Sequence, residues 1–425
     1  MAESLVDVSE KVIPGDVEVA TKQPRRFVLF ENHNLRLLWF GESISLLGDQ
    51  FYMVAMPWLV LQLTGSAIAV GTIVAVAGIP RALLMLIGGV FTDRVTPRVL
   101  MLFSNASRIV ITGLLTFLVL TNTIQVWMLY VFSLAFGIVD AFFQPAAMAI
   151  VPALVTEDQL ASANASMQGT ALMVTAAGPG IAGALVKIVG TSFAFFLDTI
   201  SFAVATVMLL VMMPPKAEAK PAKHGSIMAD IREAMAYIRQ DELLGLLLII
   251  VVALNFLFTG PLMVGPAVLA KERFAEQGSV AMGILLSAMG LGSLIGMVGG
   301  SVLKPTRMGL LTLSTIMFAG VGIAAAAFTS SLGIMAVLFA VVGASTGFSN
   351  LLLITWLQKR ISKEMMGRVM SIIMLASMGL MPISAAVAGF VANTSLTLLF
   401  ALNGSLLVLT AILSLLNKKV RAMRA

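Results

Sequence analysis

The chain has 425 residues, of which 59% are hydrophobic and only 11% are charged. Ordinary soluble domains carry about 25% charged residues, so this composition cannot cover a water-facing surface and excludes a soluble globular protein. Cysteine is absent, which excludes disulfides, thiolate metal sites and cysteine nucleophiles, and the two histidines, His33 and His224, lie outside the apolar stretches.

The first 35 residues form a polar tail without the short apolar core of a cleaved signal peptide. From residue 36 onward, apolar stretches of about 20 residues, the length that crosses a bilayer, alternate with short polar loops. Twelve such stretches begin near Leu37, Ala67, Val99, Val126, Asn164, Ser192, Leu243, Val280, Met308, Ser331, Val369 and Leu396. The sequence therefore predicts an all-α membrane protein with twelve transmembrane helices.

A polar segment over residues 214–242 divides these stretches into two groups of six. Its second part places Ile227, Ile231, Ala234, Met235 and Ile238 on one face of an otherwise charged helix, which we expect to lie on the cytoplasmic membrane surface. The predicted organisation is a six-helix bundle over 36–213, this linker, a second bundle over 243–417 and a basic tail over 418–425. Such internal repetition is typical of secondary transporters.

Most of the 27 lysine and arginine residues fall in the tails and in the loops on the same side of the membrane as the tails. This asymmetry follows the positive-inside rule and predicts that both termini are cytoplasmic, in the inner membrane of the cell. The net charge of +6 then reflects membrane topology, and we expect no nucleic-acid partner.

Ionisable side chains inside the predicted spans occur only in the first half of the chain. They are Glu42, Asp49, Arg81, Arg108, Asp140 and Asp198. Each costs about 2.5 to 3.5 kcal/mol at the bilayer centre on insertion scales, so such residues are read as functional. Asp49, Arg81, Arg108 and Asp140 lie near the midplane with balanced charge, and we expect them to neutralise one another across a polar cavity. Helical spacing adds Gln144 to the face of Asp140.

Two interpretations of this cluster remain open. The charges can form fixed ion pairs between helices, or Asp49 and Asp140 can bind and release a proton as the cavity opens to each side in turn. The second interpretation predicts a proton-coupled transporter whose cavity also includes Glu42, Asp198 and Gln144. No loop of the form G-x-x-x-x-G-K-[ST] occurs, so we expect the proton gradient to supply the energy, with no cofactor and no metal.

Two motifs carry a family resemblance. The first lies between the second and third spans, has the spacing G-x-x-x-D-R-x-x-x-R and consists of Gly89, Asp93, Arg94 and Arg98. The second lies in the fifth span and consists of Gly178, Pro179, Gly180 and Gly183. The first resembles the loop signature of the major facilitator superfamily, and the second is similar to the antiporter motif of its drug exporters. The resemblance extends along nearly the whole chain, to the branch that includes macrolide efflux and enterobactin export proteins.

The resemblance implies the major facilitator fold, with Asp93, Arg94 and Arg98 as a gate at the cytoplasmic face. The alternative for the two arginines is that they only anchor the loop by the positive-inside rule. Pro179 lacks a donor, so we expect the fifth helix to break or bend, either as a contact between the halves or as a simple packing kink. The chain departs from the branch at Asn105, where an acid is common, which leaves Asp49 or Asp140 as the partner of Arg108.

The expected function is proton-coupled export of drugs or other small amphiphilic molecules by a monomer in the lipid bilayer. The 28 methionines and 24 phenylalanines indicate an apolar, adaptable cavity wall. A cationic substrate fits Asp49 or Asp140, an anionic one fits Arg81 or Arg108, and the sequence does not choose. Two alternatives are a dedicated exporter of one native metabolite, such as a siderophore or a lysophospholipid, and a receptor without transport. No set of nucleophile, base and metal indicates an enzyme.

Overall fold

The computed structural model describes residues 28–92, 95–213, 227–303, 307–421 and 423, and within these ranges helix is the only regular secondary structure. In chain order the helices are α1 (Val28–Glu31), α2 (His33–Thr64), α3 (Ala67–Thr92), α4 (Pro97–Leu120), α5 (Val126–Leu154), α6 (Glu157–Val189), α7 (Thr191–Val211), α8 (Ile227–Gln240), α9 (Glu242–Glu272), α10 (Ser279–Leu303), α11 (Met308–Ala326), α12 (Leu332–Arg360), α13 (Lys363–Thr394), α14 (Leu396–Leu416) and α15 (Lys418–Arg421). Twelve of them, α2 to α7 and α9 to α14, are long and apolar enough to cross a membrane. The predicted all-α fold with twelve transmembrane helices is confirmed.

Short polar residues set several of the helix ends. Asn32 accepts a hydrogen bond from the Leu35 N–H at 3.0 Å and so caps the start of α2. Thr156 and Gln159 form a reciprocal capping box at the start of α6. Gly65 ends α2 in the left-handed region at φ 69°, a conformation that a side chain would strain. Each cap supplies partners for backbone groups that the helix itself leaves unsatisfied.

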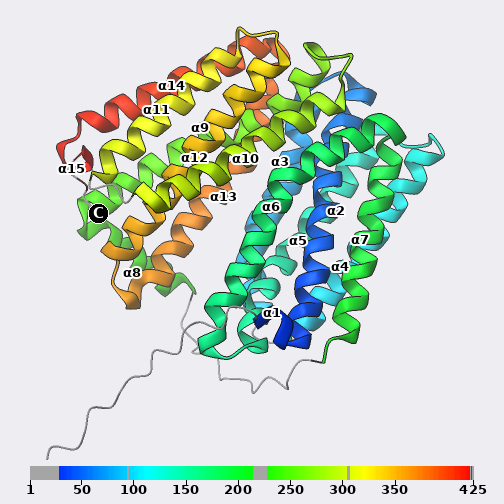
Figure 1. The fold of residues 1–425 in the computed structure, drawn as a ribbon, viewed down its shortest axis with the longest axis horizontal. Coiled ribbons are helices and arrows are strands. Elements are labelled where there is room, and N and C mark those ends of the chain that lie inside the picture. Colours follow the sequence, from blue (N-terminus) through cyan, green and yellow to red (C-terminus); the bar gives the residue numbers. More distant parts are fainter. Residues whose placement is uncertain (1–27, 93–94, 214–226, 304–306, 422, 424–425) are drawn as a thin grey trace, which may run out of the picture.

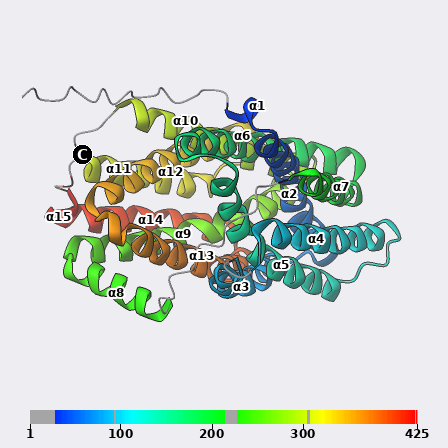
Figure 2. The same cartoon turned by 90° about the horizontal axis from the view of Figure 1, so that it is seen from below.

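The helices form two bundles, α2 to α7 and α9 to α14, which meet at one end and separate at the other (Figure 1). Helices α1 and α8 lie at the end where the bundles separate. Seen from below, α3 and α13 lie side by side where the two bundles meet, midway along the lower edge of the view (Figure 2). The two halves are joined at the end away from α1 and α8, which carries the loops after α2 and α9.

Glycines allow the close approach of the halves at this joined end. A Cβ added at Gly283 of α10 would stand 2.5 Å from the carbonyl oxygen of Pro179 in α6. In the same way, a Cβ at Gly71 of α3 would stand 2.4 Å from the carbonyl oxygen of Ala385 in α13. Real Cβ atoms do not come so near a backbone oxygen, so both contacts require glycine, as close helix packing in membranes commonly does.

Two lysines add polar contacts across the same joint. Lys271 of α9 donates through Nζ to the carbonyl oxygen of Leu61 in α2 at 2.8 Å. Lys187 of α6 donates to the carbonyl oxygen of Glu276, in the loop after α9, at 2.7 Å. Each lysine thus satisfies a backbone acceptor of the opposite half, and the pair stabilises the state in which this end is closed.

We expect Gly283→Leu to shift the protein toward a state in which the joined end is open, because the larger side chain cannot fit against Pro179. The chain has no native cysteine, so a single Met53→Cys probe can be labelled without background. Met53 lies in α2 and lines the cavity of the molecule, so its labelling reports access to that cavity. Labelling of this probe by an impermeant maleimide from the side opposite α8 should rise several-fold. Gly299→Leu on the same helix is the control, since nothing lies within 4 Å of a Cβ at that position; equal labelling in both variants would refute the assignment.

The linker helix α8 buries its apolar face against the second bundle. Ala234 is fully buried and Ile238 is buried to 3% exposure, in one cluster with Leu244, Leu247 and Val369. On the charged side of α8, Glu233 forms an ion pair of 2.7 Å with Arg368 of α13. These two members of the predicted apolar stripe therefore contact protein and do not face the membrane surface.

Large apolar side chains point outward over much of the molecule. Examples are Phe103, Ile188 and Phe390, with exposures of 69%, 81% and 65%. Such exposure is far greater than a soluble monomer shows, and it matches a protein whose outer surface contacts lipid.

Candidate functional site: a charge cluster in the first bundle and a cavity in the second

The charge cluster is held by four helices of the first bundle. Asp49 lies in α2, Arg81 in α3, Arg108 in α4 and Asp140 in α5, and each is close to the middle of its helix. A helix centre is the part farthest from water in a membrane-spanning segment, where a charge needs a partner. The four side chains therefore share one depth, as the sequence predicts.

Asp140 binds both arginines of the cluster. Its Oδ2 lies 2.8 Å from Nε of Arg81, and its Oδ1 accepts a hydrogen bond from Nη2 of Arg108. The Arg81 side chain is 33% exposed, whereas the Arg108 side chain is 2% exposed. Of the two partners left open for Arg108 by the sequence, the structure selects Asp140.

Three aromatic rings surround the buried guanidinium of Arg108. Its Cζ lies 4.1 Å from the ring centre of Phe143, 5.2 Å from that of Phe202 and 5.5 Å from that of Phe136. The negative faces of aromatic rings attract a cation, most strongly where water is excluded. The box of rings and the Asp140 carboxylate together stabilise a charge that is otherwise costly at this depth.

Asp49 sits beside this ion pair without joining it. Its side chain is half-buried, and within the described part of the chain it forms no ion pair and no hydrogen bond. It interacts electrostatically with Arg108, Asp140 and Arg81. Glu42, two turns earlier on α2, interacts with Arg108 and Asp49 in the same way. The two acids of α2 thus interact electrostatically with the charges of the cluster, while their carboxylate oxygens can still accept a proton or a hydrogen bond.

Asp198 of α7 is fully buried against α2. A Cβ at Gly48 would come within 2.7 Å of its Oδ1, and the Ser201 side chain packs at the same point. Asn105 of α4, also fully buried, has no hydrogen-bond partner for either amide atom within the described chain. Buried polar atoms normally find partners, so these groups mark a polar interior of the first bundle. Gln144, one turn beyond Asp140, is half-buried.

The loop motif is only partly covered by the described residues. Asp93 and Arg94 lie outside them, as do the surroundings of Gly89 near the end of α3. Arg98 donates from Nε to the carbonyl oxygen of Leu209 and from Nη2 to that of Leu210, both at 2.8 Å. A cation at these carbonyls satisfies the carboxyl end of α7. The gate function expected of Asp93, Arg94 and Arg98 therefore stays a prediction.

The helix-five motif lies in α6, which continues as one helix from Glu157 to Val189. Pro179 does not break it, contrary to the stronger form of the expectation. Gly180 N–H donates to the Ser287 hydroxyl of α10 at 2.8 Å, and Gly183 accepts from the Ser279 hydroxyl at 2.9 Å. Gly178 faces α2, where a Cβ would lie 2.4 Å from the Gln50 side chain. The motif is thus a contact between the halves.

A cavity of about 540 Å³ lies in the second bundle, among α9, α10, α11 and α12. Its wall is mostly apolar and includes methionines from several elements, which are Met53, Met263, Met289, Met308 and Met423. None of the charged residues of the cluster lines it, and no lining residue carries a charge. The second half supplies nearly all of the cavity wall, with Met53 of α2 added from the first half, whereas the ionisable residues of the cluster all lie in the first half and do not line the cavity.

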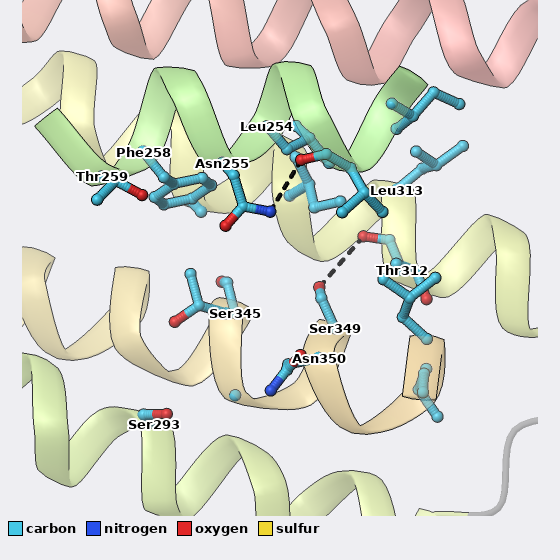
Figure 3. A pocket seen from close by; sticks show the side chains of 18 of the residues that line it. Leu254, Asn255, Phe258, Thr259, Ser293, Thr312, Leu313, Ser345, Ser349 and Asn350 are labelled. Carbon is cyan, nitrogen blue, oxygen red and sulfur yellow. Dashed lines mark hydrogen bonds between the residues drawn. The ribbon is translucent and has the colours of Figure 1, made fainter. Parts of the chain in front are cut away.

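Neutral polar side chains face this cavity from opposite walls. In Figure 3, Asn255 and Thr259 of α9 lie across from Ser345 and Ser349 of α12, while Asn350 of α12 lies on the side of that helix nearer Ser293. Sequence reasoning left these residues out of the predicted site because they carry no charge. The available signal was neutral polar residues within apolar spans, with Ser345 and Ser349 one turn apart on one face.

Among the described residues, no three carboxylates or histidines are grouped so as to hold a metal ion. The interactions that the structure shows at the site are ion pairing, hydrogen bonding and apolar contact.

Comparisons with known proteins show which transporters this chain is similar to. Macrolide efflux protein A of Streptococcus pyogenes is 24% identical over 399 residues, covering 90% of this chain and 96% of that protein. The multidrug efflux pump Tap of Mycolicibacterium fortuitum is 26% identical, with 73% and 77% covered, and the enterobactin exporter EntS of Shigella dysenteriae is 26% identical, with 79% of each covered. The solved structure of a variant of the nucleoside transporter NupG has a TM-score of 0.72 at 12% identity, covering 90% of this chain and 99% of that one, and so shares the fold.

The family model of the Major Facilitator Superfamily matches residues 38–386, which include most of both bundles. With twelve apolar helices, two bundles and relatives named as efflux proteins, the chain is a multi-pass membrane transporter. It belongs to the major facilitator superfamily.

Proposed function

We propose that the protein is a proton-coupled exporter of small amphiphilic molecules in the inner membrane, working by alternating access. The observation that carries the proposal is the buried ion pair of Asp140 with Arg81 and Arg108, with the Asp49 carboxylate beside it. Charged groups at mid-membrane depth are costly and are found where ions or protons move.

Within this cluster the two acids have different roles. Asp140 is already bound by two guanidiniums, so a proton there must displace a cation. Asp49 has no such partner in the described chain and can accept a proton without breaking a contact. We assign the exchangeable proton to Asp49 and a positioning role to Asp140. Glu42 lies two turns before Asp49, toward the end of α2 that adjoins α1, and we assign it the role of passing the proton between Asp49 and water.

A single proton can supply useful work. Moving one charge down a potential of 100 mV releases about 2.3 kcal/mol. Each 1.4 kcal/mol supports a tenfold concentration ratio, so one-for-one exchange of a proton for an uncharged molecule sustains roughly a 40-fold substrate gradient from voltage alone. Exchange for a monovalent cation moves no net charge and is driven by the pH gradient only.

The arrangement of the halves supports alternating access. The glycine contacts of α6 with α10 and of α3 with α13, together with the two lysines, join the halves at the end away from α8. Glycine contacts and single lysine hydrogen bonds can separate without unfolding either bundle, and relative motion of two repeats is the motion that such transporters use.

The direct test is flux in proteoliposomes with an imposed pH gradient. The substrates are a panel of cationic, neutral and anionic amphiphiles, and the expected result is uphill movement of at least one of them that a protonophore abolishes. Empty liposomes give the background. Movement that ignores the pH gradient and the potential would refute proton coupling while leaving the fold assignment intact.

A dedicated exporter of one native metabolite is the second candidate, because the relatives include an enterobactin exporter. It predicts a narrow substrate profile in the same assay. Transport of several unrelated amphiphiles with similar affinity would exclude it.

A further inference from the structure

The cavity of the second bundle offers hydrogen bonds without charge. Asn255 donates through its amide to the Val251 carbonyl oxygen at 2.9 Å, which leaves its Oδ1 without a donor in the described chain. The side chains of Ser293, Ser345 and Asn350 also make no hydrogen bond to described residues. These polar atoms line a cavity and have their bonding capacity available, which is the arrangement expected of a ligand site.

The lining makes a charged ligand unfavourable. An ion brought from water into an apolar site without a counter-charge loses several kcal/mol of hydration that hydroxyls and amides do not restore. The carboxylates and guanidiniums of the other half do not line the cavity. An uncharged molecule meets no such cost and gains from burying apolar surface against Met289, Phe258 and Trp356.

The size also defines the ligand. About 540 Å³ falls within the range of roughly 300 to 1,000 Å³ typical of small-molecule sites. Polar groups on α9 and α12 face each other across the space, as Figure 3 shows, so a molecule between them can bond at both edges while its apolar body contacts methionine. Flexible methionine side chains adapt to ligands of different shape.

We propose that this cavity is the cargo site and that it selects uncharged amphiphiles with hydrogen-bonding groups, excluding organic cations and anions. The inference rests on the proposed export function and adds its substrate class. Cargo and proton then bind in different halves of the protein, cargo near Asn255 and proton at Asp49.

The test is equilibrium binding to the purified full chain in nanodiscs, without any gradient, so that it does not depend on proton coupling. The probes are N-phenyl-1-naphthylamine, which is uncharged, and 8-anilinonaphthalene-1-sulfonate, which has the same ring framework plus an anionic group; tetraphenylphosphonium is the cationic competitor. Empty nanodiscs correct for partition into lipid. We expect the uncharged probe to bind at least about tenfold more tightly than the anion, a difference of 1.4 kcal/mol, and to resist displacement by the cation.

Two variants connect binding to the cavity. Ser345→Leu fills the space and should weaken binding of the uncharged probe about tenfold or more, while Asn255→Asp places an anion in the wall and should create binding of tetraphenylphosphonium. The matched control is Asn403→Asp. Like Asn255, Asn403 donates a hydrogen bond from its side-chain amide to the carbonyl oxygen four residues earlier, at 2.7 Å, but it does not line the cavity. A monodisperse elution profile is required of each variant.

Several results would overturn the proposal. These are tight binding of either charged probe to the wild-type protein, unchanged binding in Ser345→Leu, or equal gain of cation binding in Asn255→Asp and Asn403→Asp. If the uncharged probe binds as expected but the pH gradient drives no flux, the proton-coupled function fails and the cargo class stands.

Discussion

Replacing Asp140 by alanine should reduce the stability of the protein by about 3 to 5 kcal/mol, the usual cost of removing one partner from a buried ion pair. The loss is large because the change leaves the Arg108 guanidinium, whose side chain is 2% exposed, without its carboxylate. The rings around it keep part of the attraction but cannot neutralise a charge. The measurement is the midpoint of thermal unfolding in detergent, compared with the wild-type protein.

A second change tests whether this loss comes from the charge. Adding Arg108→Met to the Asp140→Ala variant removes the unpaired cation and should restore much of the lost stability, since apolar replacement of a buried pair is often close to neutral. Glu157→Gln, at the exposed start of α6, is the control and should cost under about 1 kcal/mol. If the double variant is no more stable than Asp140→Ala, the Asp140 contact does not act by neutralising Arg108.

Replacing Asp49 by asparagine should abolish uphill transport while leaving the protein folded. Asp49 makes no contact in the described chain that the amide would break, yet it is the carboxylate best placed to exchange a proton beside the cluster. Without the proton, the concentration ratio of roughly 40 that 100 mV can sustain for an uncharged substrate falls to one. Counterflow of substrate between equal concentrations, which needs no proton, should persist.

The comparison of uphill flux and counterflow separates Asp49 from the structural residues. A misfolded variant loses both activities, and an uncoupled one loses only the first. Asp49→Asn proteoliposomes that still accumulate substrate against its gradient when the pH gradient is imposed would exclude Asp49 as the proton carrier. Asp49→Glu, which keeps the acid, should retain coupling.

The helices and their order could be read from the sequence because bilayer thickness imposes a minimum apolar length on every crossing. The ends were less accurate where the first turn of a helix is polar. The fifth span was expected to begin near Asn164, whereas α6 begins at Glu157 with the Thr156 capping box. Hydropathy detects the part of a helix in lipid, and caps act outside it.

The charge cluster was also visible in advance, since an ionisable residue in an apolar span is rare enough to stand out. The pairing was not, because Arg108 had two possible partners at the same depth. Only the packing of α4 against α5 decides for Asp140. The position of the cavity was missed altogether, because its residues are neutral and resemble the many serines and asparagines that bond to their own helix.

By itself the sequence determined the membrane environment, twelve crossings, two halves and the depth of four charges, all of which follow from composition and from distance along a helix. The tertiary structure alone decided which charges touch, which glycines join the halves, and that the cavity lies among α9, α10, α11 and α12, with none of those charges in its lining. These contacts depend on how helices far apart in the chain are rotated and packed against one another. Helical periodicity predicts the face of the helix on which a residue lies, but not which other helix packs against that face.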